Sequence, residues 1–125
     1  MNGLTLAYIG DAYYELEIRR YLIDKGYNQV KFLHNKAIKY TSGLAQARII
    51  EYLLKNECLN EEEINAFKRG RNNSSSGRKN LDAKTYVVAT GFESLIGYLY
   101  LSKKQDRLDE IVKMAIAIIE EDNNG

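Results

Sequence analysis

The stretch LTLAYIGDAYYELEIRRYLIDK, residues 4–25, decides the fold class of this 125-residue chain. Its apolar side chains recur every three or four residues, beginning with Leu4, Tyr8 and Ala12, which is the period of an amphipathic helix. Gly26 follows directly, and glycine is the residue that most often ends a helix. The pattern therefore predicts one long helix over residues 4–25.

The same period continues along the rest of the chain, which contains no proline, the commonest helix breaker. The spacing predicts further helices over residues 30–40, 44–55, 61–69, 82–102 and 106–121. Asn60 and Glu63 have the spacing of a capping box at the start of the fourth helix. The stretch GRNNSSSGRKN, residues 70–80, has no apolar residue and indicates an exposed loop. The sequence thus predicts an all-α helical bundle that forms a single domain over residues 1–125.

Composition excludes several classes of protein. With 45% hydrophobic and 28% charged residues, the chain is neither disordered nor collagen-like. No apolar run reaches the roughly 18 residues that a membrane-spanning helix needs, and no signal-peptide pattern is present. We therefore expect a soluble, cytoplasmic protein that binds no membrane. Cys58 is the single cysteine, which precludes an intrachain disulfide, and the absence of a P-loop or GxGxxG motif argues against a nucleotide cofactor.

Charge is unevenly distributed although the net charge is only +1. Residues 68–84 hold six basic side chains against Asp82 alone, whereas residues 106–122 hold six acidic side chains against Arg107 and Lys113. This arrangement suits a protein that binds a polyanion on one face and repels it from another. Two solvated surfaces would give the same pattern, and charge alone does not decide between them.

Two acidic residues stand next to glycines inside apolar helices: Asp11 after Gly10, and Glu93 two residues after Gly91. Glycine in a helix costs about 0.5 to 1 kcal/mol relative to alanine, and an unpaired buried carboxylate costs more. If the first and fifth helices pack side by side, Asp11 and Glu93 can converge on one hard cation such as Mg²⁺ or Mn²⁺. The alternative is that carboxylates on these helices face water. Glu15, for example, could pair with Arg19 one turn later on the surface.

Two motifs resemble a known family. LAYIGDAYYELEIRRYL, residues 6–22, resembles the signature helix of the ribonuclease III catalytic domain, and ATGFESLIGYLYL, residues 89–101, resembles its second acidic helix. KRGRN, residues 68–72, lies between them. Together they resemble the Mini-ribonuclease III branch of that family, from residue 4 to about residue 121.

The resemblance implies an all-α endonuclease domain that acts as a homodimer on double-stranded RNA, with Mg²⁺ as its cofactor and Mn²⁺ as a plausible substitute. The branch lacks a separate double-stranded-RNA-binding domain, and its characteristic substrate is the precursor of the large-subunit ribosomal RNA in bacteria. Asp11 and Glu93 match the acidic residues that are catalytic and bind metal in the family. Tyr8 matches an aromatic residue at the dimer interface. Ala7 and Thr90 stand where larger members carry two more carboxylates, so we expect one Mg²⁺ held by two acids and several waters.

Without an appended binding domain, the RNA must contact the catalytic domain itself, mostly through its phosphates. We expect these contacts from the basic and polar side chains in and beside the loop over residues 70–80: Lys68, Arg69, Arg71, Asn72, Arg78 and Lys79. Two alternatives remain open: a non-catalytic helical module that binds RNA or dimerises with the same fold, and a general helical protein-interaction domain, which the ten tyrosines would suit.

Overall fold

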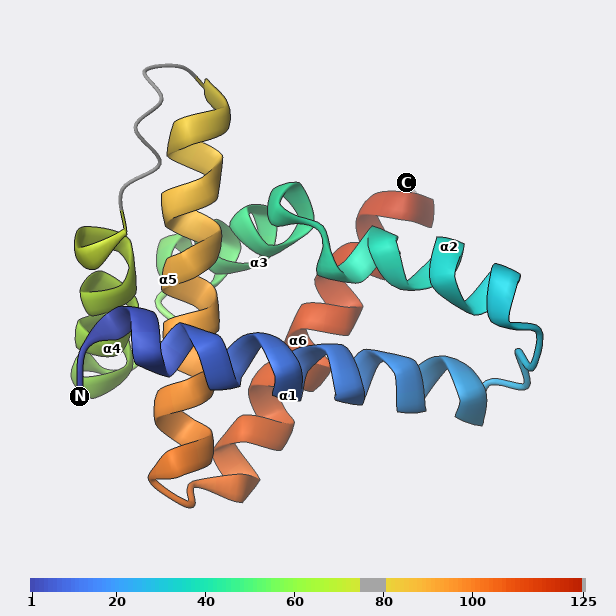
Figure 1. Ribbon diagram of the computed structural model, residues 1–125, viewed down its shortest axis with the longest axis horizontal. Helices are drawn as coiled ribbons and strands as arrows, with labels where there is room; N and C mark the ends of the chain where they lie inside the picture. Colours follow the sequence, from blue (N-terminus) through green and yellow to red (C-terminus); the bar gives the residue numbers. More distant parts are fainter. Residues whose placement is uncertain (75–80, 125) are drawn as a thin grey trace.

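The computed structural model describes residues 1–74 and 81–124 of the chain, and over those residues it consists of helices and short connections (Figure 1). The all-α prediction is confirmed. The six helices are α1 (Gly3–Asp24), α2 (Val30–Thr41), α3 (Gly43–Lys55), α4 (Glu61–Asn73), α5 (Leu81–Leu101) and α6 (Gln105–Asn124). Within the part of the chain that is described, no helix is long and apolar enough to span a membrane.

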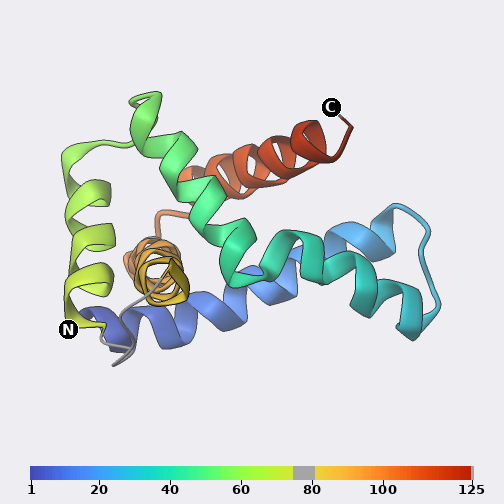
Figure 2. The same ribbon diagram turned by 90° about the horizontal axis from the view of Figure 1, so that it is seen from above.

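Helix α5 lies at the centre of the bundle. Seen nearly end-on in Figure 2, it has α1, α3 and α4 around it. Four of its apolar side chains are completely buried: Phe92, Leu95, Ile96 and Leu99. Phe92 meets the ring of Tyr14 from α1 edge to face, with 5.1 Å between ring centroids. The Tyr14 hydroxyl donates a hydrogen bond of 2.9 Å to the carbonyl oxygen of Tyr40, which ties the end of α2 to this core. A side chain of α5 that points toward α1, α3 or α4 is therefore held firmly in place.

Helices α1 and α5 cross at two glycines, Gly10 and Gly97. A Cβ atom at Gly10 would lie 1.8 Å from the carbonyl oxygen of Glu93, and one at Gly97 would lie 1.9 Å from that of Leu6. Both distances are far inside van der Waals contact, so no side chain fits at either position. The glycines therefore bring the two backbones together and place Asp11, the next residue of α1, beside α5.

The end of α1 agrees with the prediction made for Gly26. This residue has a φ angle of +102°, in the left-handed region that glycine adopts at little cost. The Tyr27 N–H donates to the Leu22 carbonyl oxygen at 3.3 Å, and the Gly26 N–H donates to Ile23 at 2.9 Å. These two bonds form a Schellman motif, which satisfies the last carbonyl groups of the helix.

Helix α4 begins as predicted but ends later. Asn60 and Glu63 form a reciprocal capping box at its start, with both bonds 2.9 Å long. The helix then continues to Asn73, so the prediction of a loop beginning at Gly70 is wrong for residues 70–73. The reason is tertiary packing: Gly70 is buried against α5, where an added Cβ would lie 2.5 Å from that of Ser94. The rest of the predicted loop, residues 75–80, lies outside the described residues.

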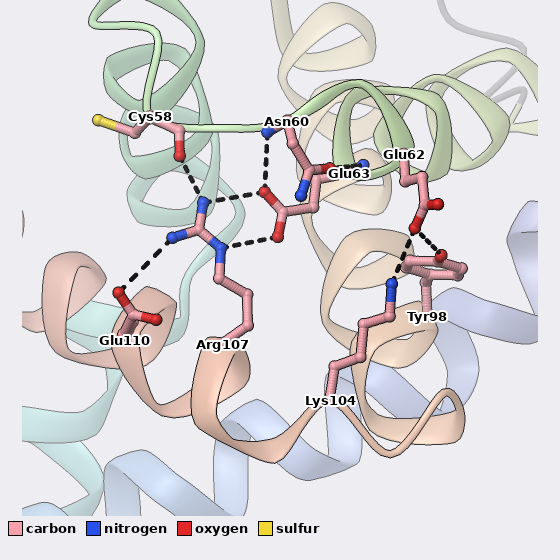
Figure 3. A network of polar contacts seen from close by, with 8 residues as sticks. All are labelled: Cys58, Asn60, Glu62, Glu63, Tyr98, Lys104, Arg107 and Glu110. Atoms are coloured by element: carbon pink, nitrogen blue, oxygen red, sulfur yellow. Dashed lines mark hydrogen bonds and ion pairs between the residues drawn. The ribbon is translucent and has the colours of Figure 1, made fainter.

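A buried ion pair joins α4 to α6 (Figure 3). Glu63 is 1% exposed and accepts two hydrogen bonds from Arg107, at 2.7 Å from Nε and 2.9 Å from Nη2. Arg107 also donates to the backbone carbonyl of Cys58. Burial alone would raise the pKa of Glu63, but the bonds from Arg107 and from the Asn60 backbone outweigh it and lower that pKa. This acidic residue therefore serves both as a helix cap and as a link between helices.

Candidate active site

The structure brings Asp11 and Glu93 together. Their carboxyl groups are hydrogen-bonded to each other beside the crossing of α1 and α5, with Asp11 exposed and Glu93 partly buried. Burial raises the pKa of Glu93 to about 8, and the hydrogen bond and negative charge of Asp11 add to the increase. Two carboxyl groups this close share one proton unless a cation neutralises them. The roles of the pair in catalysis and metal binding remain predictions.

Glu15 lies one turn beyond Asp11 on the same helix and adds negative charge to the site. Its charge contributes to the raised pKa of Glu93, although less than burial and Asp11 do. Its own carboxylate is paired with Arg19, whose Nε lies 3.4 Å from Oε2. Glu15 therefore behaves as the surface-pairing alternative predicted, and the carboxyl pair consists of Asp11 and Glu93.

Gln46 in α3 also lies beside Glu93, and its sequence context did not predict a role at this site. Its side-chain amide lowers the pKa of Glu93 and so partly opposes the effect of burial. Gln46 is 2% exposed, and its Oε1 atom has no hydrogen-bond partner among the described residues. A signal was present in the sequence, because Gln46 precedes Ile49, Ile50 and Leu53 at helical spacing and so occupies the apolar stripe of α3.

The donor set around the pair fits a hard divalent cation. The described residues contain no cluster of three or more histidine, cysteine or acidic side chains that could hold a metal ion. The carboxyl oxygens of Asp11 and Glu93 and the unpartnered Oε1 of Gln46 are all oxygen donors, which suit Mg²⁺ or Mn²⁺ that retains several water ligands. Thr90 contributes no carboxylate, and its hydroxyl donates to the Tyr86 carbonyl oxygen at 2.9 Å.

The side chains predicted to contact RNA fall into three groups. Lys68, Arg69 and Asn72 line one hollow of about 650 Å³ on the outside of α4, together with Tyr98 of α5. The Arg69 guanidinium lies 5.7 Å from the centre of the Tyr98 ring. Arg71 is not in this hollow. The remaining two predicted contacts, Arg78 and Lys79, lie outside the described residues.

Arg71 packs against its own helix instead of lining the hollow. Its guanidinium carbon lies 5.3 Å from the centre of the Phe67 ring, and its Nε donates to Oδ1 of Asn72 at 3.1 Å. Arg71 therefore supports the position of Asn72, which itself lines the hollow.

Tyr8 points into solvent from α1, one turn before Asp11. Its side chain is 83% exposed, and other large apolar side chains of α1 and α2 are exposed with it. These are Leu4, Leu16, Ile23, Val30, Phe32 and Ile38. An exposed set of apolar side chains of this size is typical of a surface that a partner covers.

Comparisons with known proteins identify the family of the chain. A family model described as the ribonuclease III domain matches residues 4–104. Mini-ribonuclease 3 of Acholeplasma laidlawii is 52% identical over 121 residues, which cover 97% of this chain and 96% of the relative. Mini-ribonuclease 3 of Enterococcus faecalis is 48% identical over 124 residues, which cover 98% of this chain and 94% of the relative.

A solved structure gives the same result for the fold. The crystal structure of a protein from Fusobacterium nucleatum aligns with a TM-score of 0.81 and 32% sequence identity, covering 94% of this chain and 93% of that chain. The family match, the long and similar relatives, and the shared fold agree with one another. The chain therefore belongs to the ribonuclease III family, in its Mini-ribonuclease 3 branch.

Proposed function

We propose that this chain is a magnesium-dependent endoribonuclease that hydrolyses phosphodiester bonds in double-stranded RNA, with Asp11 and Glu93 as its catalytic and metal-binding residues. One observation carries the proposal: the glycine crossing of α1 and α5 holds these two acids together where the site opens to solvent. Such an arrangement is costly for the fold, because neighbouring carboxyl groups repel one another once both are ionised. A cation that binds between them offsets this cost.

Hydrolysis of a phosphodiester needs a water molecule made nucleophilic near neutral pH and stabilisation of the charge that develops on the phosphate. When bound, a divalent cation supplies both. Asp11 offers its carboxylate from the exposed side of the site. Glu93 must first release the proton that it holds in the free protein, because its pKa is raised to about 8. Activity should therefore increase with pH across the neutral range.

The hollow on α4 is the proposed binding surface for the RNA backbone. Lys68 and Arg69 supply positive charge for the phosphates, and the amide of Asn72 can pair with phosphate oxygens or 2′-hydroxyl groups. Arg71 lies outside this hollow, and its contact with RNA, like those of Arg78 and Lys79, stays a prediction from the sequence. Following the resemblance, the cellular substrate is a precursor of the large-subunit ribosomal RNA, and the site of action is the cytoplasm.

The proposal includes a homodimer. Tyr8 is 83% exposed, further apolar side chains are exposed along α1 and α2, and a second copy packed against these helices would remove them from water. Two subunits that met here would carry two carboxyl pairs, one for each strand of a duplex. A non-catalytic RNA-binding module with this fold is the second candidate, and the absence of further carboxylates at Ala7 and Thr90 favours it.

The test is incubation of the purified chain with long double-stranded RNA, in Mg²⁺ and in chelator, beside the variants Asp11→Asn and Asp24→Asn. Asp24 is an exposed acid at the end of the same helix, so its variant is the matched control. An enzyme cuts RNA only in Mg²⁺, loses cutting with Asp11→Asn and retains it with Asp24→Asn. RNA that is retarded in a gel but never cut supports the binding module. Cutting by Asp11→Asn at the parental rate contradicts the assignment of the catalytic pair.

A further inference from the structure

Gln46 is a polar residue in an apolar place. It is 2% exposed in α3, on the stripe that continues through Ile49, Ile50 and Leu53, all of which are completely buried. Burying a side-chain amide costs free energy unless its donors and its acceptor are all hydrogen-bonded. An apolar residue of similar size would pack at this position without that cost. The amide therefore requires an explanation other than packing.

The orientation of the amide is fixed by the end of α2. Its Nε2 donates a hydrogen bond of 3.1 Å to the carbonyl oxygen of Thr41. Turning the amide over would set Oε1 against that carbonyl, with two acceptors facing each other and no proton between them. The amide also faces the Glu93 carboxyl group closely enough to lower its pKa. Because a donated N–H favours the ionised form of a carboxyl group and so lowers its pKa, an N–H of Gln46 is the group directed at Glu93.

The oxygen of the same amide is left free. Oε1 of Gln46 is buried and has no hydrogen-bond partner among the described residues. An unpaired acceptor in a protein interior is unfavourable unless a group absent from the protein chain itself completes it. The Gln46 amide, whose N–H is directed at Glu93, thus also has an unpaired acceptor in Oε1.

We propose that Gln46 is a positioning residue of the metal site: its N–H orients the Glu93 carboxylate toward the divalent cation, and its Oε1 accepts a hydrogen bond from a water molecule bound to that cation. This inference rests on the proposed function, since it requires Asp11 and Glu93 to hold the cation. It gives the site a neutral oxygen in a chain where Ala7 and Thr90 provide no carboxylates.

The test is calorimetric titration of the full chain with Mn²⁺ alone, without RNA, for the parent, Gln46→Met and Gln29→Met. Methionine keeps the size of glutamine and removes both amide atoms. Gln29 is exposed and its side chain makes no capping bond, so it is the matched control. We expect Gln46→Met to weaken Mn²⁺ binding by about 10- to 100-fold, the usual effect of losing a residue that supports a metal ligand. Gln29→Met should bind like the parent.

Two outcomes overturn different claims. Equal Mn²⁺ binding by the parent and Gln46→Met refutes the role of Gln46 and leaves the proposed function intact. Failure of the parent itself to bind Mn²⁺ refutes the proposed function. The melting temperature in chelator distinguishes a positioning role of Gln46 from a purely structural one. A positioning role predicts that Gln46→Met binds Mn²⁺ more weakly, while the metal-free variant still melts within a few degrees of the parent.

Gln46→Glu gives an independent test, and it decides the matter if Gln46→Met does not fold. This variant keeps the size of the side chain but adds a third carboxyl group beside Asp11 and Glu93. We expect a lower melting temperature than the parent in chelator and a larger increase on adding Mn²⁺, because the cation neutralises the added repulsion. An increase no larger than that of the parent, or a variant that stays unfolded in Mn²⁺, contradicts the proposal.

Discussion

Gly10 in α1 lies directly against the carbonyl oxygen of Glu93 in α5, so closely that a Cβ atom at Gly10 would stand 1.8 Å from it. The residue that permits the crossing is thus adjacent to Asp11, and the residue it contacts is Glu93. The backbone contact and the carboxyl pair have one structural origin. A change that separates the helices should therefore affect both the stability of the fold and the site.

The first prediction concerns this contact. Gly10→Ala should lower the free energy of unfolding by about 1 to 3 kcal/mol or more, because the methyl group forces α1 and α5 apart, although alanine favours a helix. Gly43→Ala is the matched control, since its added Cβ would meet no atom nearer than 4.0 Å. It should leave stability unchanged or raise it by up to about 1 kcal/mol. Urea denaturation measures both, and equal effects would contradict the crossing described here.

The second prediction concerns pH. The pKa of Glu93 is raised from 4.5 to about 8 in the folded protein, so between these values the folded state holds a proton that the unfolded state has lost. Stability of the metal-free protein should therefore fall as the pH rises through this range. Glu93→Gln cannot ionise, so its melting temperature in chelator should exceed that of the parent increasingly toward pH 8.

The control for this pH dependence is Glu51→Gln, at an exposed acidic position of α3. Its melting temperature should differ from that of the parent by the same small amount at every pH. If the advantage of Glu93→Gln did not grow between about pH 5 and pH 8, Glu93 would not carry the raised pKa that burial and Asp11 impose.

The third prediction concerns the link between α4 and α6. Arg107→Met removes both hydrogen bonds to the Glu63 carboxylate, which is 1% exposed, and leaves it uncompensated. The expected loss of stability is about 3 to 5 kcal/mol at neutral pH. Arg48→Met removes an exposed pair with Asp122 and should cost no more than about 1 kcal/mol. Similar losses in the two variants, measured by urea denaturation, would show that the buried pair contributes no more to stability than the exposed pair.

The effect of the Arg107–Glu63 pair on stability should also depend on pH. Its bonds lower the pKa of Glu63, so the stability they contribute is present above the ordinary pKa of about 4.5 and is lost as the pH falls further. In Arg107→Met the uncompensated carboxyl group should gain from protonation instead. The stability deficit of the variant should therefore shrink at low pH, and a deficit that stayed constant would contradict this assignment.

The fourth prediction concerns RNA. Lys68→Glu and Arg69→Glu should each weaken binding of double-stranded RNA. Each should also reduce the slope of the logarithm of the binding constant against the logarithm of the salt concentration by the amount that corresponds to about one phosphate contact. The control is Lys113→Glu, the same change of charge at an exposed position of α6. Filter binding with Asp11→Asn as the common background avoids cleavage. If all three variants had the same affinity and salt dependence, the hollow on α4 would not be the RNA surface.

Local signals sufficed for most of the fold. Apolar spacing predicted all six helices of the described residues, and Gly26 and the Asn60 capping box predicted two of their ends, because these features depend on residues near in sequence. The end of α4 was not predictable, because residues 70–73 stay helical through the contact of Gly70 with α5. A polar composition indicated a loop there, and tertiary packing overrode it.

The candidate site was partly predictable for the same reason. Glycines beside acids inside apolar helices indicated that Asp11 and Glu93 could meet, and the structure brings them together. The contact of Gln46 with Glu93 depends on how α3 lies against α5, which no spacing within α3 reveals. The pairing of Arg107 with Glu63 likewise joins residues 44 positions apart, and the charge pattern placed Arg107 only within an acidic surface stretch.

The most direct test of the account is a crystal structure of the full chain grown with Mn²⁺, with the ion located by its anomalous scattering. We expect one strong peak within coordination distance of both the Asp11 and the Glu93 carboxyl groups, and no such peak in crystals of Asp11→Asn. A Mn²⁺ ion bound elsewhere, with the two carboxyl groups still in contact, would contradict this assignment.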